Sequence, residues 1–350
     1  MTIADDKKLT VLPSIWIHTE AGPQMGFGHL KRCMILAGEL ENCARAFFIL
    51  RPRDRWSGDI LKAQGFDCQN IDFSRLWHNL YINPAALLID TRLPDGLDAL
   101  IRMAREKRIP VISMHDMGLN PLCSDIAVDG SIAAASHHDL PSRRAFTGAA
   151  YMVLDPALRE LRRKSARIRR EIRSVFVSLG GGNARKYFLP VLGGLRLWAA
   201  QNGREVEVVG MRGFVEWGQD DFNEKTLYPL RFRWETGPAA GFLCHSDLAV
   251  TAGGISAYEA LCSGTPLLAL SWDSLQQIAI GRIEEAGGCI SMGAGDDITP
   301  EFFAGLLEKI DGDVAVREKM MRIGMKIVDV RGSKRVAAII RRMVIRRIRN

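Results

Sequence analysis

The chain has 350 residues, 47% of them hydrophobic, and carries a formal net charge of +7. A chain of this length is too long for one ordinary domain and suits two domains of roughly 150–180 residues, each with its own core. No stretch approaches the roughly 18 apolar residues that a membrane span needs, and residues 1–8 have no apolar signal core, so we expect a soluble, cytoplasmic protein.

Apolar runs alternate with helical patterns along most of the chain. The first half predicts strands at 14–18, 46–50, 86–89, 111–114 and 126–128, with helices near 30–40, 59–64 and 96–107. After a charged connector at 151–172, the second half predicts strands at 174–179, 206–209, 232–235, 248–251 and 267–270. Its predicted helices lie near 186–202, 239–244, 255–262 and 277–285, and from residue 300 onward only helices are expected. Residues 210–227 show no clear pattern.

This alternation is typical of parallel sheets covered by helices. We therefore expect an α/β fold of two Rossmann-like parallel-sheet domains that face each other across a cleft. The predicted divisions are an N-terminal domain at 1–160, a C-terminal domain at 161–335 and a basic helix or tail at 336–350. Ligands of such sheets bind at the carboxyl ends of the strands and between domains.

The excess positive charge gathers at 159–173 and in the tail. Neither stretch has the interleaved aromatic residues of a single-strand binder, so we expect no nucleic-acid partner and interpret 159–173 as a solvated helix face or linker. The tail alternates arginines with apolar residues at helical spacing, and it could dock on the protein or make peripheral contact with an acidic membrane. The seven cysteines lack tight ligand spacing, which predicts free thiols, no metal and no cofactor.

A first glycine corner lies at Gly26-Phe27-Gly28-His29, between the first strand and the helix near 30–40. Glycines let the backbone approach a phosphate or sugar, and the helix N-terminus points free N–H groups toward it. Histidine titrates near neutral pH, so His29 is a candidate acid or base, although it could also only cap or pack at the helix start. A dinucleotide fingerprint would need a third glycine where Lys31 stands.

Two more glycine corners lie in the second half. The loop at 180–183 (GGGN) joins a strand to a helix and could hold phosphate, or be a plain tight turn. At 253–256 (GGIS), two glycines precede a helix whose N–H groups would face a diphosphate. Glu259, one turn later, is placed to accept both hydroxyls of a ribose, although a glutamate there also suits the helix dipole.

Together these motifs resemble a known group of enzymes. The motifs at 252–254, Glu259, 264–266, Gln277 and Gly287 look like the nucleotide-binding half of GT-B-fold enzymes related to the lipid II-forming N-acetylglucosaminyltransferase. Residues 25–33 (MGFGHLKRC) are similar to the signature of the UDP-sugar hydrolases of pseudaminic acid biosynthesis and their spore-coat polysaccharide relatives. Further matches lie at 89–90, Asp116, 123–125 and 178–181, and the resemblance extends from about residue 14 to residue 335.

The resemblance implies a GT-B fold and a UDP-linked diacetamido-trideoxy hexose as substrate. Water would attack the anomeric carbon with inversion and release UDP, with His29 as general base and with Gln276 and Asp116 assisting it. Glu259 would hold the ribose and the rear glycines the diphosphate. Helix N-termini can stabilise the charge of UDP as it leaves, so this chemistry does not strictly require a metal.

The chain departs from the family's pattern at three places. His18 and Glu20 stand where the family has Arg-x-Asp, and His115 replaces the first of two aspartates. Gln276 replaces the asparagine of an Asn-Gln pair, which would displace a water-positioning amide by about 1 Å. These departures leave open which sugar is bound.

Two other functions remain open on the same residues: an inverting GT-B glycosyltransferase with a UDP-sugar donor, and a non-catalytic nucleotide-sugar-binding protein. We expect a monomer or weak dimer whose partner is the UDP-sugar. The substrate-binding residues expected in either enzyme are Gly26, Gly28, Gly180, Gly181, Gly253, Gly254, Ser256, Glu259 and Gln277.

Overall fold

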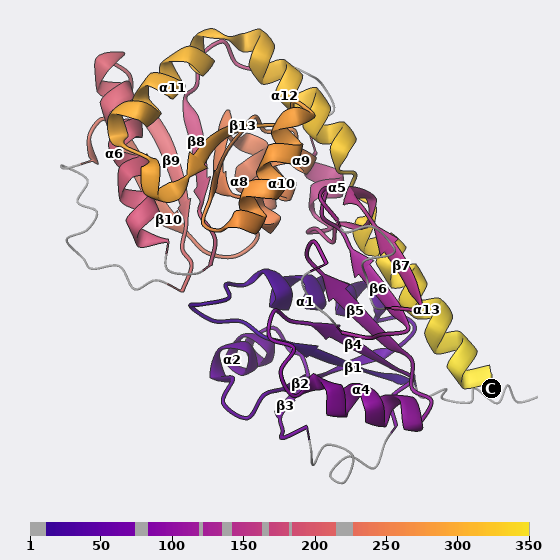
Figure 1. The fold of residues 1–350 in the computed structure, drawn as a ribbon. Helices are drawn as coiled ribbons and strands as arrows, with labels where there is room; N and C mark the ends of the chain where they lie inside the picture. The colour runs from indigo at the N-terminus through magenta and orange to yellow at the C-terminus, as the bar shows by residue number, and fades with distance from the viewer. Residues whose placement is uncertain are drawn as a thin grey trace, which may run out of the picture.

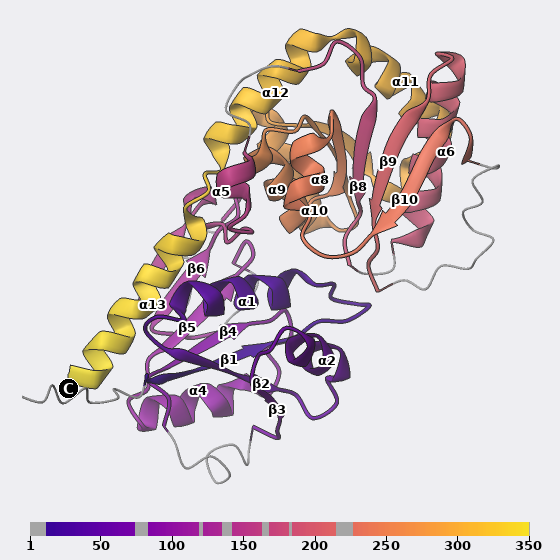
Figure 2. The same cartoon turned by 180° about the vertical axis from the view of Figure 1, so that it is seen from behind.

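The computed structural model describes residues 12–73, 83–118, 122–134, 142–162, 168–181, 184–214 and 227–349. These residues form two parallel-sheet, Rossmann-like domains (Figures 1 and 2), which confirms the predicted α/β class. One sheet has seven strands and the other six.

The first sheet comes from the first half of the chain. Its strands are β1 (Ser14–Thr19), β2 (Arg45–Leu50), β3 (Cys68–Asn70), β4 (Ala86–Asp90), β5 (Val111–His115), β6 (Ile126–Asp129) and β7 (Arg144–Thr147). They pair in parallel in the order β3-β2-β1-β4-β5-β6-β7. The helices of this half are α1 (Gly28–Leu40), α2 (Arg55–Ala63), α4 (Leu97–Glu106), η2 (Ala149–Tyr151) and α5 (Leu158–Leu161).

The second sheet has the strands β8 (Ser174–Ser178), β9 (Val206–Met211), β10 (Leu230–Glu235), β11 (Leu248–Ala252), β12 (Leu267–Ser271) and β13 (Ile290–Ala294). Their order is β10-β9-β8-β11-β12-β13, again all parallel. Its helices are α6 (Arg185–Gln201), α8 (Ala240–His245), α9 (Ile255–Ser263), α10 (Ser274–Glu285), η3 (Gly295–Asp297), α11 (Pro300–Gly312) and α12 (Val314–Ile327). The last helix, α13 (Gly332–Arg349), returns to the first domain (Figure 1).

Each sheet has a switch point where successive strands leave in opposite directions. In the first sheet it lies between β1 and β4, and in the second between β8 and β11. Loops on the two sides of a switch point diverge and leave a crevice at the carboxyl ends of the strands, which is where such folds bind ligands. The loops after β1, β8 and β11 are the three glycine corners.

The central strands read as continuous apolar runs because helices cover both faces of each sheet. In β1, Ile15 and Ile17 belong to the core cluster that includes α1, whereas Trp16 belongs to the cluster under α4. The short strands β3, β7 and β13 were not predicted. All three are edge strands, so few of their side chains are buried and no apolar run marks them.

Capping residues account for the other differences from the expected helices. The predicted helix at 59–64 begins at Arg55, because Asp54 caps it by accepting from the Ser57 N–H. The helix predicted at 277–285 begins at Ser274, because Asp273 caps the N–H groups of Leu275 and Gln276. Within the stretch without a clear pattern, β9 extends to Met211, while residues 215–226 lie outside the described part of the chain.

The start of the basic stretch at 159–173 is structural and is not simply solvated. Arg159 pairs with Glu39 and donates to Ser333 and the Val330 carbonyl, so it ties the connector to α1 and α13. Arg162 donates to the Met325 carbonyl. Residues 163–167 of this stretch lie outside the described residues.

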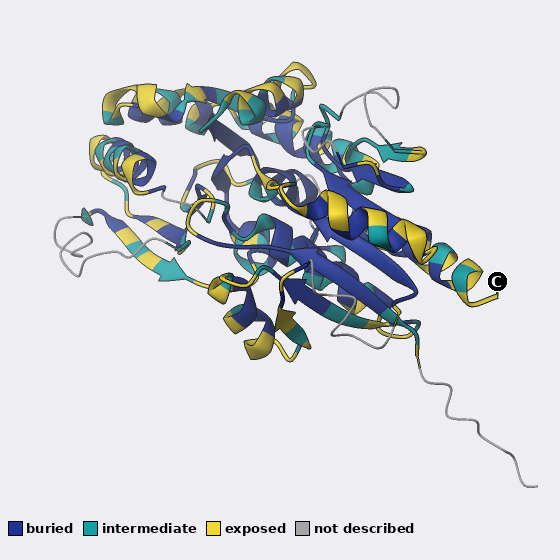
Figure 3. Ribbon diagram, turned by 60° about the horizontal axis from the view of Figure 1, so that its bottom comes forward, coloured by how far each residue is buried: buried dark blue, intermediate teal, exposed yellow. Residues whose placement is uncertain are grey.

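The basic tail forms the C-terminal part of α13 and docks on the first domain. Val336, Ile340 and Val344 are buried in the same core cluster as α1, and the helix alternates buried and exposed residues along its length (Figure 3). The charge is carried on the other face, where Arg341, Arg342, Arg346 and Arg349 are exposed. Among the helices described, none is long and apolar enough to cross a membrane.

His18 gives the first domain a pH-dependent stability. Its ring is fully buried, its Nδ1 donates to the Ile49 carbonyl at 2.9 Å, and its Nε2 has no hydrogen-bond partner among the residues that the structure describes. Burial lowers the pKa of His18 to about 4, although the Ile49 carbonyl opposes this. His18 therefore binds a proton near pH 6.5 in the unfolded chain, whereas in the folded chain it binds one only near pH 4.

We predict that the His18 contribution to stability is complete above pH 6.5 and is lost as pH falls toward 4, by about 3 kcal/mol in total. Urea unfolding across this range measures it. His18→Gln cannot titrate and should show a flatter profile than the wild type, while His245→Gln, at an exposed ring, should keep the wild-type slope. Parallel profiles for His18→Gln and the wild type would contradict the prediction.

Candidate functional site

His29 lies at the first glycine corner, in the first turn of α1. The loop after β1 closes with a bridge between Gly22 and Gly26, and α1 begins at Gly28 with no side-chain cap on its N–H groups. The His29 side chain is largely buried and points toward the end of β4. The backbone that leads into the helix therefore places both free N–H groups and an imidazole at the switch point of the first sheet.

Asp90, the last residue of β4, orients this imidazole. His29 Nδ1 lies 2.7 Å from Asp90 Oδ1 and 3.3 Å from the Arg32 guanidinium. A carboxylate oxygen can only accept at this distance, so the Nδ1 proton must lie on the bond to Asp90. That tautomer leaves Nε2 with a free lone pair, 4.0 Å from Asp116 Oδ2. The pair has the geometry of a base and the carboxylate that orients it.

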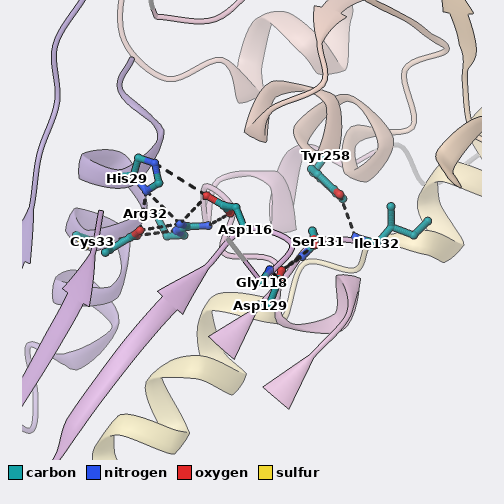
Figure 4. A network of polar contacts seen from close by, with 10 residues as sticks. His29, Arg32, Cys33, Asp116, Gly118, Asp129, Ser131, Ile132 and Tyr258 are labelled. Carbon is teal, nitrogen blue, oxygen red and sulfur yellow. Dashed lines mark hydrogen bonds and ion pairs between the residues drawn. The ribbon is translucent and has the colours of Figure 1, made fainter. Parts of the chain in front are cut away.

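Arg32, one turn after His29, holds the two carboxylates in place (Figure 4). Its Nε and Nη2 donate to the two oxygens of Asp90, each at 2.7 Å, and its Nη1 donates to Asp116 Oδ1 at 2.9 Å. Burial alone would raise the pKa of Asp90, but the Arg32 guanidinium and His29 outweigh it and hold that pKa well below its ordinary value. The same balance lowers the pKa of Asp116. Both carboxylates are therefore anionic at neutral pH.

Sequence reasoning gave no role to Asp90 or Arg32. Both lay within matched motifs, and two signals could have singled them out. Asp90 is the one charged residue at the end of the fully buried β4, and Arg32 follows His29 by three residues, which places both on one helix face. Asp116, which was predicted, lies in this network with a third of its side chain exposed.

The glycine corner at 253–256, between β11 and α9, carries the residues predicted to bind the diphosphate and the ribose. α9 begins after Gly254 without a side-chain cap, and a Cβ built at Gly254 would meet no atom within 4 Å. Gly253 instead packs tightly, since a Cβ there would lie 2.9 Å from the Cβ of Gln276. The Ser256 hydroxyl lies 3.0 Å from that of Ser178 at the end of β8. The N–H groups at the start of α9 are thus open to an anion.

The glycine loops of the two domains touch. A Cβ at Gly181 would lie 2.8 Å from the Phe27 nitrogen and 2.9 Å from the Gly26 Cα, so the second-domain loop needs a glycine at 181 for this close approach. A Cβ at Gly28 would lie 3.2 Å from the Ile255 side chain of α9. Gly180 has φ near +94° and packs on Trp272. Gly182 and Asn183 of the same loop lie outside the described residues.

Side-chain hydrogen bonds also join α9 to the first domain. Lys31 of α1 donates to Glu259 at 2.6 Å, and Glu259 is almost completely buried. Beside it, the Tyr258 hydroxyl accepts from the Ile132 N–H at 3.0 Å (Figure 4). The structure thus joins the predicted ribose residue, Glu259, to Lys31, which lies two residues after His29 on α1.

The predicted glutamines lie on the second-domain side of the site. Gln276 Oε1 accepts from the Trp272 N–H at 3.2 Å, and its side chain packs against Gly253. Gln277 is exposed on α10. In the described part of the chain no hydrogen bond or ion pair joins either glutamine to His29. The described residues also contain no group of three or more side chains suited to hold a metal ion.

Comparisons with known proteins agree on the fold. No family model matches the chain. The spore coat polysaccharide biosynthesis protein SpsG of Bacillus subtilis (strain 168) is 24% identical over 341 residues, which cover 93% of this chain and 97% of that protein. The solved structure of CalG4, the calicheamicin glycosyltransferase, matches with a TM-score of 0.65 and 16% identity over 96% of this chain and 99% of its own.

A structure of S. aureus MnaA with UDP also matches. Its TM-score is 0.63 at 12% identity, over 93% of this chain and 95% of its own. At these identities the likeness shows the fold, and the predicted GT-B-like architecture is confirmed.

We predict that neutral His29 carries its proton on Nδ1. Nitrogen-15 NMR of the imidazoles distinguishes the two tautomers directly. Asp90→Asn should shift the His29 nitrogens toward a mixture, because an amide can present either an acceptor or a donor to Nδ1. The exposed His245 is the internal control and should not respond. A wild-type His29 protonated on Nε2 would contradict the assigned geometry.

Proposed function

We propose that this protein is a nucleotide-sugar hydrolase that splits a UDP-linked amino or deoxy sugar into UDP and free sugar. The observation that carries the proposal is the His29–Asp90 pair, whose histidine lies on α1, the helix that meets Glu259 of the second domain through Lys31. A base held in one tautomer beside an open helix N-terminus suits attack on a substrate with an anionic leaving group.

The chemistry follows from the positions of the groups. His29 Nε2 takes a proton from water as the oxygen attacks the anomeric carbon from the face opposite UDP. The bond to the UDP oxygen breaks, UDP leaves with the electron pair, and the anomeric configuration inverts. Asp90 and Asp116 stabilise the imidazolium that forms, while Arg32 holds both carboxylates.

UDP would be held from the second domain. The N–H groups at Gly254 and the Ser256 hydroxyl face the diphosphate, and Glu259 accepts the ribose hydroxyls. The MnaA structure with UDP supports a uridine nucleotide in this fold, and the similarity to SpsG supports a role in surface-polysaccharide biosynthesis. The resemblance of residues 25–33 supports hydrolysis of a diacetamido-trideoxy hexose nucleotide.

An inverting glycosyltransferase is the second candidate. The same His29–Asp90 pair could deprotonate an acceptor hydroxyl in place of water, and CalG4, which has this fold, is a glycosyltransferase. The exposed arginines of α13, with Ile345 and Ile348 beside them, would suit a membrane-bound acceptor.

We predict that the protein releases UDP from its UDP-sugar without an acceptor and gives the inverted anomer, as proton NMR of the fresh product would show. His29→Ala should lower the rate by roughly 10²–10⁴, the usual contribution of a positioned general base. His245→Gln, at an exposed histidine, is the matched control and should keep the full rate.

The assay uses a panel of substrates, UDP-N-acetylhexosamines and UDP-diacetamido-trideoxy hexoses. Its other outcomes separate the candidate functions. UDP release that begins only when an acceptor is added identifies the transferase. Binding without turnover under either condition identifies a nucleotide-sugar-binding protein. Release that is equally fast in His29→Ala would remove the catalytic role of His29.

A further inference from the structure

Lys31 is hydrogen-bonded to the carboxylate of Glu259, which the proposed function assigns to ribose binding. Its ammonium donates to Glu259 Oε1 at 2.6 Å, across the boundary between the two domains. The Glu259 side chain is 3% exposed, whereas that of Lys31 is 27% exposed. Lys31 is therefore the more accessible partner, and its flexible stem can turn without a shift of α1.

Glu259 cannot lose this partner without replacement. A buried carboxylate with no donor is strongly destabilising, so any group that displaces the ammonium must donate hydrogen bonds in its place. The two adjacent hydroxyls of a ribose can do so. The displaced ammonium then needs an anion, and α9, which carries Glu259, has its open N-terminus one turn earlier, where the proposed diphosphate site lies.

We infer that Lys31 is an exchangeable ligand of the nucleotide site, paired with Glu259 in the free protein and with the diphosphate when a nucleoside diphosphate is bound. This inference rests on the proposed function, and it makes Lys31 a substrate-binding residue, a role that the sequence analysis did not give it. It also couples the two halves of the nucleotide: ribose alone displaces the ammonium without giving it an anion, whereas UDP supplies both. The protein thereby discriminates against nucleosides.

Calorimetry with uridine and UDP on Lys31→Met tests the exchange. Without the competing ammonium, uridine should bind about tenfold more tightly, and without a cation for the phosphates, UDP should bind about tenfold more weakly. The ratio of the two affinities should therefore fall about a hundredfold. 2′,3′-Dideoxyuridine lacks the hydroxyls that replace Lys31, so its affinity should not rise.

Lys62→Met is the matched control, because it removes one exposed lysine of the same domain, on α2 and away from Glu259. It should keep the wild-type ratio. Equal ratios in Lys31→Met, Lys62→Met and the wild type, with UDP bound normally, overturn the inference and leave the proposed function intact. A wild type that binds no uridine nucleotide overturns both.

The wild-type protein offers a test that does not depend on the folding of a variant. Acetic anhydride labelling of Lys31, read by mass spectrometry against Lys62, should rise with saturating uridine and fall with saturating UDP. Protection by both ligands to the same degree, or by neither, contradicts the exchange.

Discussion

The site depends on one buried cation. Arg32 is 2% exposed, and its guanidinium bridges Asp90 at the end of β4 and Asp116 just beyond β5. Removing one partner from such a buried set typically costs 3–5 kcal/mol, because the remaining charge stays desolvated. The arginine therefore fixes the positions of two carboxylates from two strands relative to α1. The orientation of His29 follows from this, since its Nδ1 bonds to the same Asp90.

The topology explains why these charges meet. β1 and β4 are neighbours in the sheet but are distant in sequence, and the helix after β1 starts directly above their carboxyl ends. Only at such a switch point can residues of α1, β4 and β5 gather around one crevice. The second sheet repeats the arrangement with β8 and β11, so both domains present glycine loops at equivalent places. The contact between Gly181 and the Gly26–Phe27 backbone is where the two arrangements meet.

The features that could be predicted from the sequence are those that a local residue pattern determines. Buried parallel strands such as β4 and β11 are mostly apolar, and glycines before a helix mark the corners, so the two-domain α/β fold and the approximate place of His29 were accessible. The edge strands β3, β7 and β13 were not, because exposure removes their apolar signal, whereas the edge strand β10 was predicted at 232–235. The Asp90–Arg32 bond spans 58 residues and the Lys31–Glu259 bond spans 228, and no local spacing encodes such pairings.

The glycine corners also show that a glycine can be required for two different physical reasons, close packing or ligand binding. Gly181 and Gly253 are needed because backbone or side-chain atoms would meet a Cβ within 3 Å, whereas the space beside Gly254 is open. A packing glycine and a ligand-binding glycine look the same in a sequence, so the GG pair at 253–254 predicts a ligand site only through its second member. That member lies at the uncapped start of α9, one turn before Glu259. The ammonium of Lys31 thus neutralises the buried carboxylate of Glu259, and the electropositive end of α9 is left for an anion. On the proposed exchange, a ligand with both hydroxyls and phosphates can replace these interactions, whereas a ligand with only one of the two groups cannot.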